Sequence, residues 1–291
     1  MDLKIIAKEL RELITEKQKE LELTFEEEAH KYTMKDLDGN VRSDFPSVSK
    51  LMKLFYDEFP TEEIAYKKAK GDPYEAQQLM EEWARAGTTS TNMGSRVHFE
   101  LETETLSMFD IEKEVRQPVY ECDLEMTMKG DRMIKAGKKF LKLMKERGAV
   151  LLDTEMVLGH PELGYTGQPD KFWLMLNKEK TGFGFVVTDW KTNKPKNMET
   201  NTFTKPMKKP FEKLPNNALG HYNTQLPFYA KLLLKMLEGT KYSDIKFFGG
   251  VIVHLTDEME FVEYRIPKEV FGGIIKKIGR ASCRERVYAC V

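Results

Sequence analysis

Two short apolar runs, residues 171–176 and 183–188, constrain the fold of this chain more than any other feature of its sequence. Each run has the length and the apolar, partly β-branched character of a buried strand, and the polar stretch between them predicts a hairpin. Asp170 stands directly before the first run, and Asp189 and Lys191 follow the second one. Because side chains alternate along a strand, Asp189 and Lys191 are expected to point to one face of the sheet. Two carboxylates and one ammonium group should therefore meet at one end of the sheet.

This combination of side chains suits a divalent metal ion. Mg²⁺ and Mn²⁺ prefer hard oxygen ligands, and proteins commonly supply one or two carboxylates while water and phosphate oxygens complete the coordination. A neighbouring lysine can orient the attacking water or stabilise developing negative charge. The alternative is a surface ion pair that follows a core strand, and an Asp-x-Lys tripeptide alone does not separate the two interpretations. Trp190, between the two charged residues, is expected to face the opposite side of the sheet.

Three further sequence blocks accompany this hairpin. The complete set is Gly-Ser-Arg-Val-His-Phe-Glu-Leu-Glu at 94–102, Thr154-Glu155, Gly-Gln-Pro-Asp at 167–170 with Asp-Trp-Lys-Thr at 189–192, and Gln225-x-x-x-Tyr229. In content and order these blocks resemble the PD-(D/E)XK nuclease superfamily, specifically its RecB-like exonuclease branch, which includes phage exonucleases and the mitochondrial genome maintenance exonuclease. The resemblance implies an α/β fold of the restriction-endonuclease-like type, with a mixed central sheet flanked by helices.

The resemblance also implies a role for individual residues. The catalytic residues would be Asp170, Asp189, Lys191 and Glu155, the last of which borders the site. The metal ligands would be His98, Asp170, Asp189 and the backbone carbonyl of Trp190. The expected cofactor is Mg²⁺ or Mn²⁺, and the expected reaction is the hydrolysis of phosphodiester bonds from DNA ends.

Two histidines are interpreted differently. His98 and Glu102 are four residues apart in a predicted helix and share one face, so the simplest interpretation is a side-chain pair. The resemblance instead favours His98 as an additional metal ligand, and imidazole binds Mn²⁺ more readily than Mg²⁺. His30 is far from the four blocks in the sequence and is interpreted as structural.

Two further regions are expected to contact DNA. The resemblance assigns Gln225 and Tyr229 to a helix that borders the scissile phosphate. The stretch 191–213 has an excess of lysine over glutamate and several prolines that exclude a long helix. Such a basic loop could follow the phosphate backbone through Lys194, Lys196, Lys205 and Lys208, with Phe203 and Phe211 stacking on bases, or it could be an ordinary solvated loop.

The resemblance suggests a role in phage or mobile-element replication or recombination, with DNA that has single- or double-stranded ends as the partner and recombination or replication proteins as further candidates. Two alternatives are kept. One is a structure-specific or restriction-type endonuclease with the same core, and the other is a non-catalytic DNA-binding module. The presence of Asp170, Asp189 and Lys191 together argues against the module, because binding alone does not require all three.

Composition places the chain among soluble globular proteins with one substantial core. It has 291 residues, of which 41% are hydrophobic and 32% charged, and its net charge is −1. No global basic character indicates a nucleic-acid partner. No apolar run reaches the length of a membrane span and the first residues do not open a signal peptide, so a cytoplasmic location is expected, in the bacterial host if the gene is a phage gene.

The last stretch, 278–291, resembles the translation of a sequencing-library adapter and is expected to be an artefact. Without it Cys122 is the one remaining cysteine, so no intramolecular disulfide is expected. The rest is divided into an N-terminal extension with helices and a β-hairpin at 1–93, and a nuclease core at 94–277.

Hydrophobic periodicity and turn signals predict the remaining elements. Helices are expected over residues 2–20, 48–56, 124–147 and 221–237, with another beginning at Gly94 after a polar capping stretch at 87–92. Strands are expected over 150–158, 245–255 and 261–266, and Asp38-Gly39 predicts a hairpin turn near the N-terminus.

Overall fold

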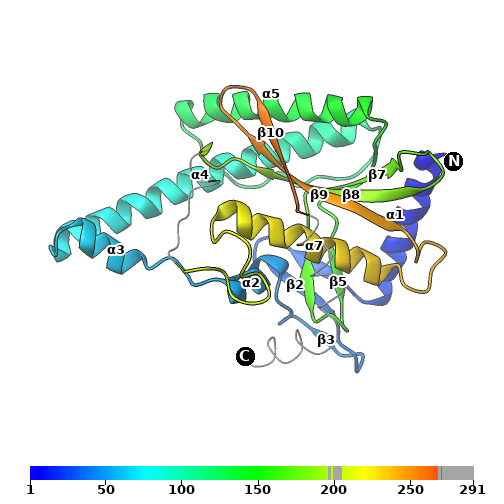
Figure 1. Ribbon diagram of the computed structural model, residues 1–291, viewed down its shortest axis with the longest axis horizontal. Helices are drawn as coiled ribbons and strands as arrows, with labels where there is room; N and C mark the ends of the chain where they lie inside the picture. The colour runs from blue at the N-terminus through cyan, green and yellow to red at the C-terminus, as the bar shows by residue number, and fades with distance from the viewer. Residues whose placement is uncertain (196–197, 199–204, 268–269, 271–291) are drawn as a thin grey trace.

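The computed structural model describes residues 1–195, 198, 205–267 and 270. A five-stranded mixed sheet in the order β10-β9-β8-β7-β4 lies at its centre (Figure 1). Within this sheet β8 and β9 are parallel and the other neighbours are antiparallel. The predicted α/β class, with helices flanking a mixed sheet, is confirmed. The strands are β4 Val150–Thr154, β7 Lys171–Leu176, β8 Phe183–Lys191, β9 Lys246–Leu255 and β10 Phe261–Arg265.

The predicted hairpin forms from β7 and β8. Their antiparallel register pairs Lys171 with Thr188. The turn is stabilised by Asn177, whose side-chain oxygen accepts hydrogen bonds from the backbone N–H groups of Thr181 at 2.9 Å and Gly182 at 3.2 Å. This pairing brings the beginning of β7 beside the end of β8, and the charged residues of the hairpin lie at that end of the sheet.

Two long helices, α4 Pro73–Met108 and α5 Leu124–Glu146, cover one face of the sheet. The buried side chain of Phe140 on α5 meets the sheet here, with its ring edge-on to Trp190 at 5.3 Å and to Phe261 at 5.5 Å between centroids. Trp190 therefore faces this core, as the alternation along the strand predicts.

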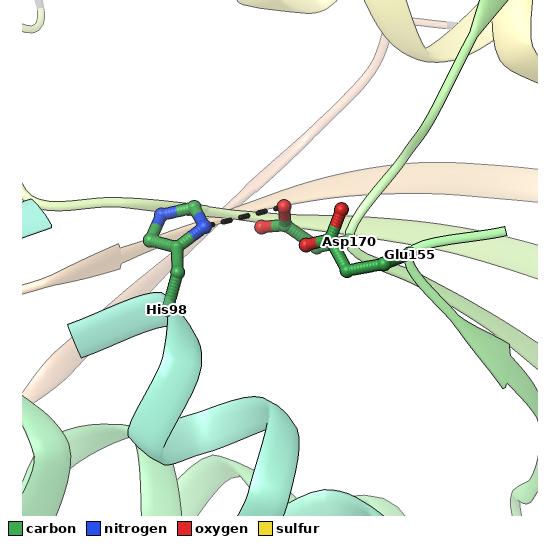
Figure 2. A group of neighbouring side chains, drawn as sticks. All are labelled: His98, Glu155 and Asp170. Atoms are coloured by element: carbon green, nitrogen blue, oxygen red, sulfur yellow. Dashed lines mark ion pairs between the residues drawn. The ribbon is translucent and has the colours of Figure 1, made fainter. Parts of the chain in front are cut away.

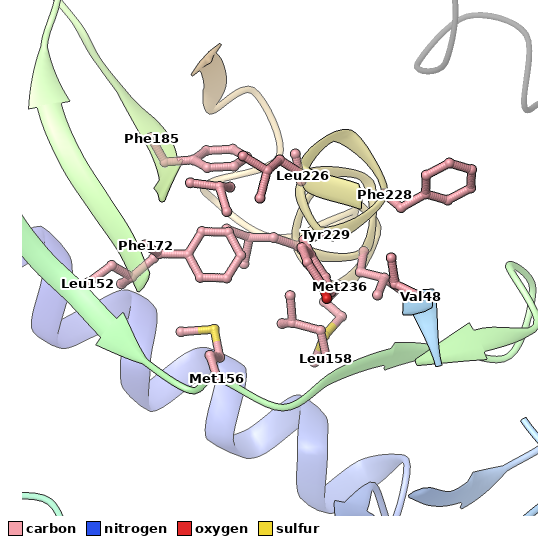
Figure 3. Packing of buried hydrophobic residues seen from close by; sticks show 14 of the residues in the cluster. Val48, Leu152, Met156, Leu158, Phe172, Phe185, Leu226, Phe228, Tyr229 and Met236 are labelled. Carbon is pink, nitrogen blue, oxygen red and sulfur yellow. The ribbon is translucent and has the colours of Figure 1, made fainter. Parts of the chain in front are cut away.

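The opposite face packs against α1 Leu3–Glu20 and α7 Ala218–Met236. Figure 3 shows how aromatic and aliphatic side chains from the sheet and from α7 interleave in this second core. Its fully buried members include Leu152, Phe172 and Phe185 from the strands and Leu226, Phe228 and Met236 from α7. The sheet is therefore packed against helices on both faces, and the charged residues of the β7–β8 hairpin lie at one of its ends.

The sequence pattern predicts residues 61–87 to be helical with an interruption at 71–73, and the helix α4 continues without a break through 87–93, where that pattern predicts a cap. We expected a helix from Gly94 with the polar stretch 87–92 as its cap, but the cap is Asp72. Its side-chain oxygen accepts hydrogen bonds from the backbone N–H groups of Tyr74 at 2.8 Å and Glu75 at 3.1 Å. Proline in the first turn is compatible with this start, because its missing N–H has no partner within the helix.

The polar stretch continues as helix because its hydroxyl groups are satisfied internally. Thr88 and Thr89 donate hydrogen bonds to the carbonyl oxygens four residues earlier, at 3.2 Å and 3.0 Å. The boundary expected between residues 93 and 94 consequently falls inside α4.

The helix α7 passes through a proline. Asn217 caps it by accepting a hydrogen bond from the backbone N–H of Gly220 at 2.8 Å. Pro227 lies in the helix interior and is buried, and the helix extends on both sides of it. Pro227 therefore does not begin the helix, and Gln225 lies in its second turn.

The N-terminal hairpin is confirmed as part of a separate three-stranded sheet in the order β1-β2-β3. At its predicted turn Gly39 has a φ of +84°, a conformation that favours glycine. The remaining elements are β1 Thr24–Glu26, β2 Lys31–Lys35, β3 Val41–Arg42, α2 Val48–Met52, the 3₁₀ helix η1 Lys53–Phe55, α3 Thr61–Lys68, β5 Leu158–His160 and β6 Tyr165–Gly167. None of the helices within the described part of the chain has the length and apolar character that crossing a membrane would require. The tail at 278–291 lies outside the described residues.

Replacing Phe140 by alanine should destabilise the protein by about 3–5 kcal/mol, because it leaves a cavity between α5 and the sheet. Chemical denaturation would measure the change in the free energy of unfolding. The exposed Lys142 on the same helix provides the control, since Lys142→Ala should alter stability little. Equal stability of both variants would contradict the packing described for this face.

Candidate metal centre

Three potential metal ligands from separate elements converge at the polar end of the sheet. His98 comes from the middle of α4, Glu155 directly follows β4 and Asp170 directly precedes β7. One donor atom from each lies within 4.8 Å of the others, and His98 Nδ1 is 3.3 Å from Asp170 Oδ1 (Figure 2). Imidazole and carboxylate donors at this spacing could hold one divalent cation.

Asp170 is fixed by the neighbouring strands. Its Oδ2 accepts a hydrogen bond of 2.5 Å from the backbone N–H of Trp190, and its backbone carbonyl accepts one of 3.0 Å from the N–H of Glu155. Asp170 is 6% exposed, so its orientation is set by these bonds and the surrounding packing. The remaining carboxylate oxygen, Oδ1, is the one that faces His98.

Glu155 occupies a strained backbone position. We expected it inside a strand over 150–158, but β4 ends at Thr154 and Glu155 has a φ of +43°. This left-handed conformation is unfavourable for a residue with a side chain. The amide of Gln168 donates a hydrogen bond of 3.2 Å to the Glu155 carbonyl, and the Glu155 N–H bonds to Asp170. The bend turns the Glu155 side chain toward the other two donors.

Asp189 and Lys191 form an ion pair at the end of β8, on the face opposite Trp190. The Lys191 ammonium also lies 4.5 Å from the ring centroid of Tyr222 on α7. Asp189 is 5% exposed, and the side chain of Lys191 is 18% exposed. The structure therefore confirms that these two side chains share a face, but Asp189 is not one of the three donors that it brings together.

Crowding of carboxylates perturbs this site. Burial, reinforced by the charge of Asp170, raises the pKa of Glu155 well above its usual range and also raises the pKa of Asp189. Each carboxylate thus disfavours the ionisation of its neighbours. A cation bound among these carboxylates would offset their mutual repulsion and favour their ionised forms, so the group is suited to bind a cation.

Asp170 behaves differently from its neighbours. Burial alone would raise its pKa, but the interaction with His98 and the positive charges of Lys171 and Lys191 outweigh burial and lower the pKa of Asp170. Asp170 is therefore the member of the group that is held as a carboxylate, in the form that binds a metal ion.

Two residues of the site were not predicted. Lys171 is 1% exposed, and its ammonium lies 4.7 Å from the ring centroid of Trp190. Burial lowers the pKa of this lysine although the nearby acidic residues oppose that effect. Glu102, one turn after His98, accepts a hydrogen bond of 2.8 Å from the buried hydroxyl of Thr154. The sequence signal that could have identified Lys171 is a charged residue within an apolar run. Glu102 was expected to pair with His98, and the structure shows its hydrogen bond with Thr154 instead.

A cleft of about 690 Å³ opens onto the three donors. Tyr229 lines it, and Gln225 on the same helix is half-buried. The remainder of the wall comes from the N-terminal hairpin, α2, α4 and the loop 109–123. Residues from these segments include Phe25, His30, Tyr32, Ser49, Thr91 and Arg116.

The expected DNA-binding loop is only partly described. Lys196 and Phe203 lie outside the described residues, and Lys194 is exposed. Lys205 and Lys208 are exposed as well and both pair with Asp57, at 3.6 Å and 2.8 Å. Their contact with DNA stays a prediction.

The base-stacking interpretation of Phe211 is wrong. Its ring is 4% exposed and packs edge-on against Phe55 at 4.7 Å, within the core beneath α7. The buried ring of Phe211 therefore anchors the proline-rich loop to the body of the protein.

The chain matches no protein-family model, and a search of the curated proteins also found no match.

His98→Ala should weaken Mn²⁺ binding by about tenfold or more, because metal affinity is sensitive even to groups that only orient a ligand. Isothermal titration of the protein with Mn²⁺ would measure the affinity. The matched control is His160→Ala on β5, which removes a half-buried histidine away from the three donors. An unchanged Mn²⁺ affinity in His98→Ala would show that His98 is not a metal ligand and has a structural role.

Proposed function

We propose that this protein is a metal-dependent deoxyribonuclease that hydrolyses phosphodiester bonds from DNA ends, with a restriction-endonuclease-like core. The observation that carries the proposal is the convergence of His98, Glu155 and Asp170 within 4.8 Å in an open cleft, beside the Asp189–Lys191 pair. The resemblance of the sequence blocks to RecB-like exonucleases supports the same assignment.

The chemistry of the donors fits Mg²⁺ or Mn²⁺. Two carboxylates provide the hard oxygen ligands that both ions prefer, and one imidazole shifts the preference toward Mn²⁺. Asp189 and the backbone carbonyl of Trp190 are the further ligands that the resemblance implies. When bound, the ion would polarise a phosphate oxygen and lower the pKa of a water molecule.

Lys191 is suited to act on the reacting phosphate. Its side chain is 18% exposed, and its ammonium is held by Asp189 and by the Tyr222 ring. Burial opposes the charge of Lys191, but Asp189 and Asp170 raise the pKa of the amine, so it stays protonated. A protonated amine can donate a hydrogen bond to the attacking water or to the negative charge that develops on phosphate.

The exonuclease assignment rests on His98, which the resemblance links to the exonuclease branch and which lies 3.3 Å from Asp170. Incubation with linear and supercoiled circular DNA in Mg²⁺ or Mn²⁺ would test this assignment. We expect progressive degradation of linear DNA and an intact circular plasmid. Cleavage of the circle would favour the endonuclease alternative, and an absence of any cleavage would favour the non-catalytic module.

Lys191→Ala should lower the cleavage rate by on the order of a hundredfold or more while DNA binding is largely retained, because the lost hydrogen bond acts on charge that develops during the reaction. Rates on end-labelled oligonucleotides and affinity by fluorescence anisotropy would measure the two effects. Lys191→Met removes the amine but keeps the bulk of the side chain. The same loss of cleavage in this variant would show that the effect does not come from unfolding.

The control for these variants is Lys178→Ala, which removes an exposed lysine from the turn between β7 and β8. Cleavage by both Lys191 variants at the rate of the unmodified protein would remove the lysine from the mechanism.

A further inference from the structure

Three aromatic rings of the β1–β2 hairpin, whose turn is at residues 27–30, form a cluster on the wall of the cleft. Phe25 stacks on Tyr32 with centroids 4.4 Å apart and planes 29° apart. His30 lies edge-on to both, at 5.3 Å from Phe25 and 6.2 Å from Tyr32. Tyr32 is buried, Phe25 is half-buried and His30 is exposed, so the cluster extends from the interior to the solvent.

Phe25 and Tyr32 are directly opposite each other in the β1–β2 register and Tyr32 is 5% exposed, so Phe25 and His30 are the rings of the cluster that remain accessible. The apolar core beneath the hairpin contains Leu23 and Met34 from the same segment, but none of the three rings is part of it. His30 ends the turn between β1 and β2, where its N–H donates a hydrogen bond of 3.0 Å to the Glu27 carbonyl and its φ is +46°. This turn leaves the imidazole ring exposed on the wall of the cleft, next to the half-buried ring of Phe25.

The cluster and the three metal-ligand candidates belong to one cleft. All three rings line the same space as His98, Glu155 and Asp170. Tyr32 and Glu155 both line this space, so the ring cluster and the donors share one wall-to-floor surface. A molecule with a charged group at the donors would therefore place its remaining part along this wall.

The loop 109–123 bounds the cleft on its outer side. Lys113 holds the loop to the end of β4 by a hydrogen bond of 3.0 Å to Asp153 and another to the carbonyl of Thr154. Arg116 holds it to the hairpin through an ion pair with Glu28. The cleft is thus bounded by the loop and the hairpin as well as by α4.

Charge decides which part of a nucleotide faces the hairpin. Glu27 lines the cleft beside the rings and disfavours a phosphate there. The cations Lys113 and Arg116 that also line the cleft are already paired with Asp153 and Glu28. The part of α4 that lines the cleft between residues 90 and 95 presents the hydroxyl-bearing Ser90, Thr91 and Ser95 and no acidic group. The sugar-phosphate backbone is therefore expected along α4 and the base against the aromatic rings.

We propose that Phe25 and His30, supported by the buried ring of Tyr32, form a stacking platform for an unpaired base of the nucleic acid whose phosphate lies at the His98–Glu155–Asp170 cluster. This inference rests on the function proposed above and adds to it a substrate class, single-stranded nucleic acid or the frayed end of a duplex. Stacking on aromatic rings tolerates every base, so the platform selects for an unpaired strand and not for a sequence.

The first test changes only the substrate. Single-stranded oligonucleotides carry one abasic residue at successive distances from the end, and KM and kcat are measured for each in Mg²⁺ or Mn²⁺. At one position the loss of the base should raise KM about tenfold and change kcat little, because base stacking contributes to binding. The other positions serve as internal controls.

The second test changes the platform. Phe25→Leu keeps apolar bulk and His30→Asn keeps a residue that tolerates positive φ, so both should fold, which thermal melting would verify. A 2-aminopurine base at the sensitive position should be quenched on binding to the unmodified protein, and both variants should lose most of that quenching. The control is Tyr74→Leu, which alters an aromatic residue that is 71% exposed and outside the cleft.

The outcomes separate this inference from the proposed function. One outcome is that DNA is cleaved while abasic oligonucleotides give the same KM as intact ones and both variants quench 2-aminopurine like the unmodified protein. That result overturns the platform, and the nuclease assignment stands. If no DNA is cleaved, the nuclease assignment fails. In that case quenching that depends on Phe25 and His30 would still support the platform, and its absence would overturn the platform as well.

Discussion

The hydrogen bond from the backbone N–H of Trp190 to the carboxylate of Asp170 is the interaction on which the site depends. It joins the end of β8 to the residue before β7, and it exists because the hairpin register sets those two points side by side. A slip of one residue would turn Asp189 and Lys191 toward the core that Trp190 now fills. The geometry of the site is thus a consequence of strand pairing, and the two buried faces of the sheet fix that pairing.

The other ligand candidates depend on longer-range packing. His98 is placed by α4, whose position is set by α5 and by the core around Phe140. Glu155 is placed by a bend at the end of β4 that two hydrogen bonds hold. Residues separated by more than seventy positions in the chain therefore meet only after both layers have packed. Lys171 and Lys191 supply the positive charge that offsets the acidic groups in this low-dielectric setting.

The sequence predicted those elements whose pattern is local and periodic. The hairpin of β7 and β8, the N-terminal helix, α5 and the last two strands were all recognisable from alternation or helical spacing. The extent of α4 was missed because Thr88 and Thr89 belong to residue types typical of caps, yet their hydroxyls bond within the helix. The left-handed conformation of Glu155 has no sequence signature, since it is imposed by contacts with Gln168 and Asp170. The role of the site and its family stay predictions.

The hairpin that carries the aromatic rings belongs to a small sheet of its own, which shares no strand with the central one. Its rings contribute to the cleft without being part of the strands that position Asp170 and Lys191. Changes in this peripheral sheet would leave intact the strand pairing that places Asp170. Divergence among descendants of this chain would therefore be expected to accumulate first in that wall of the cleft.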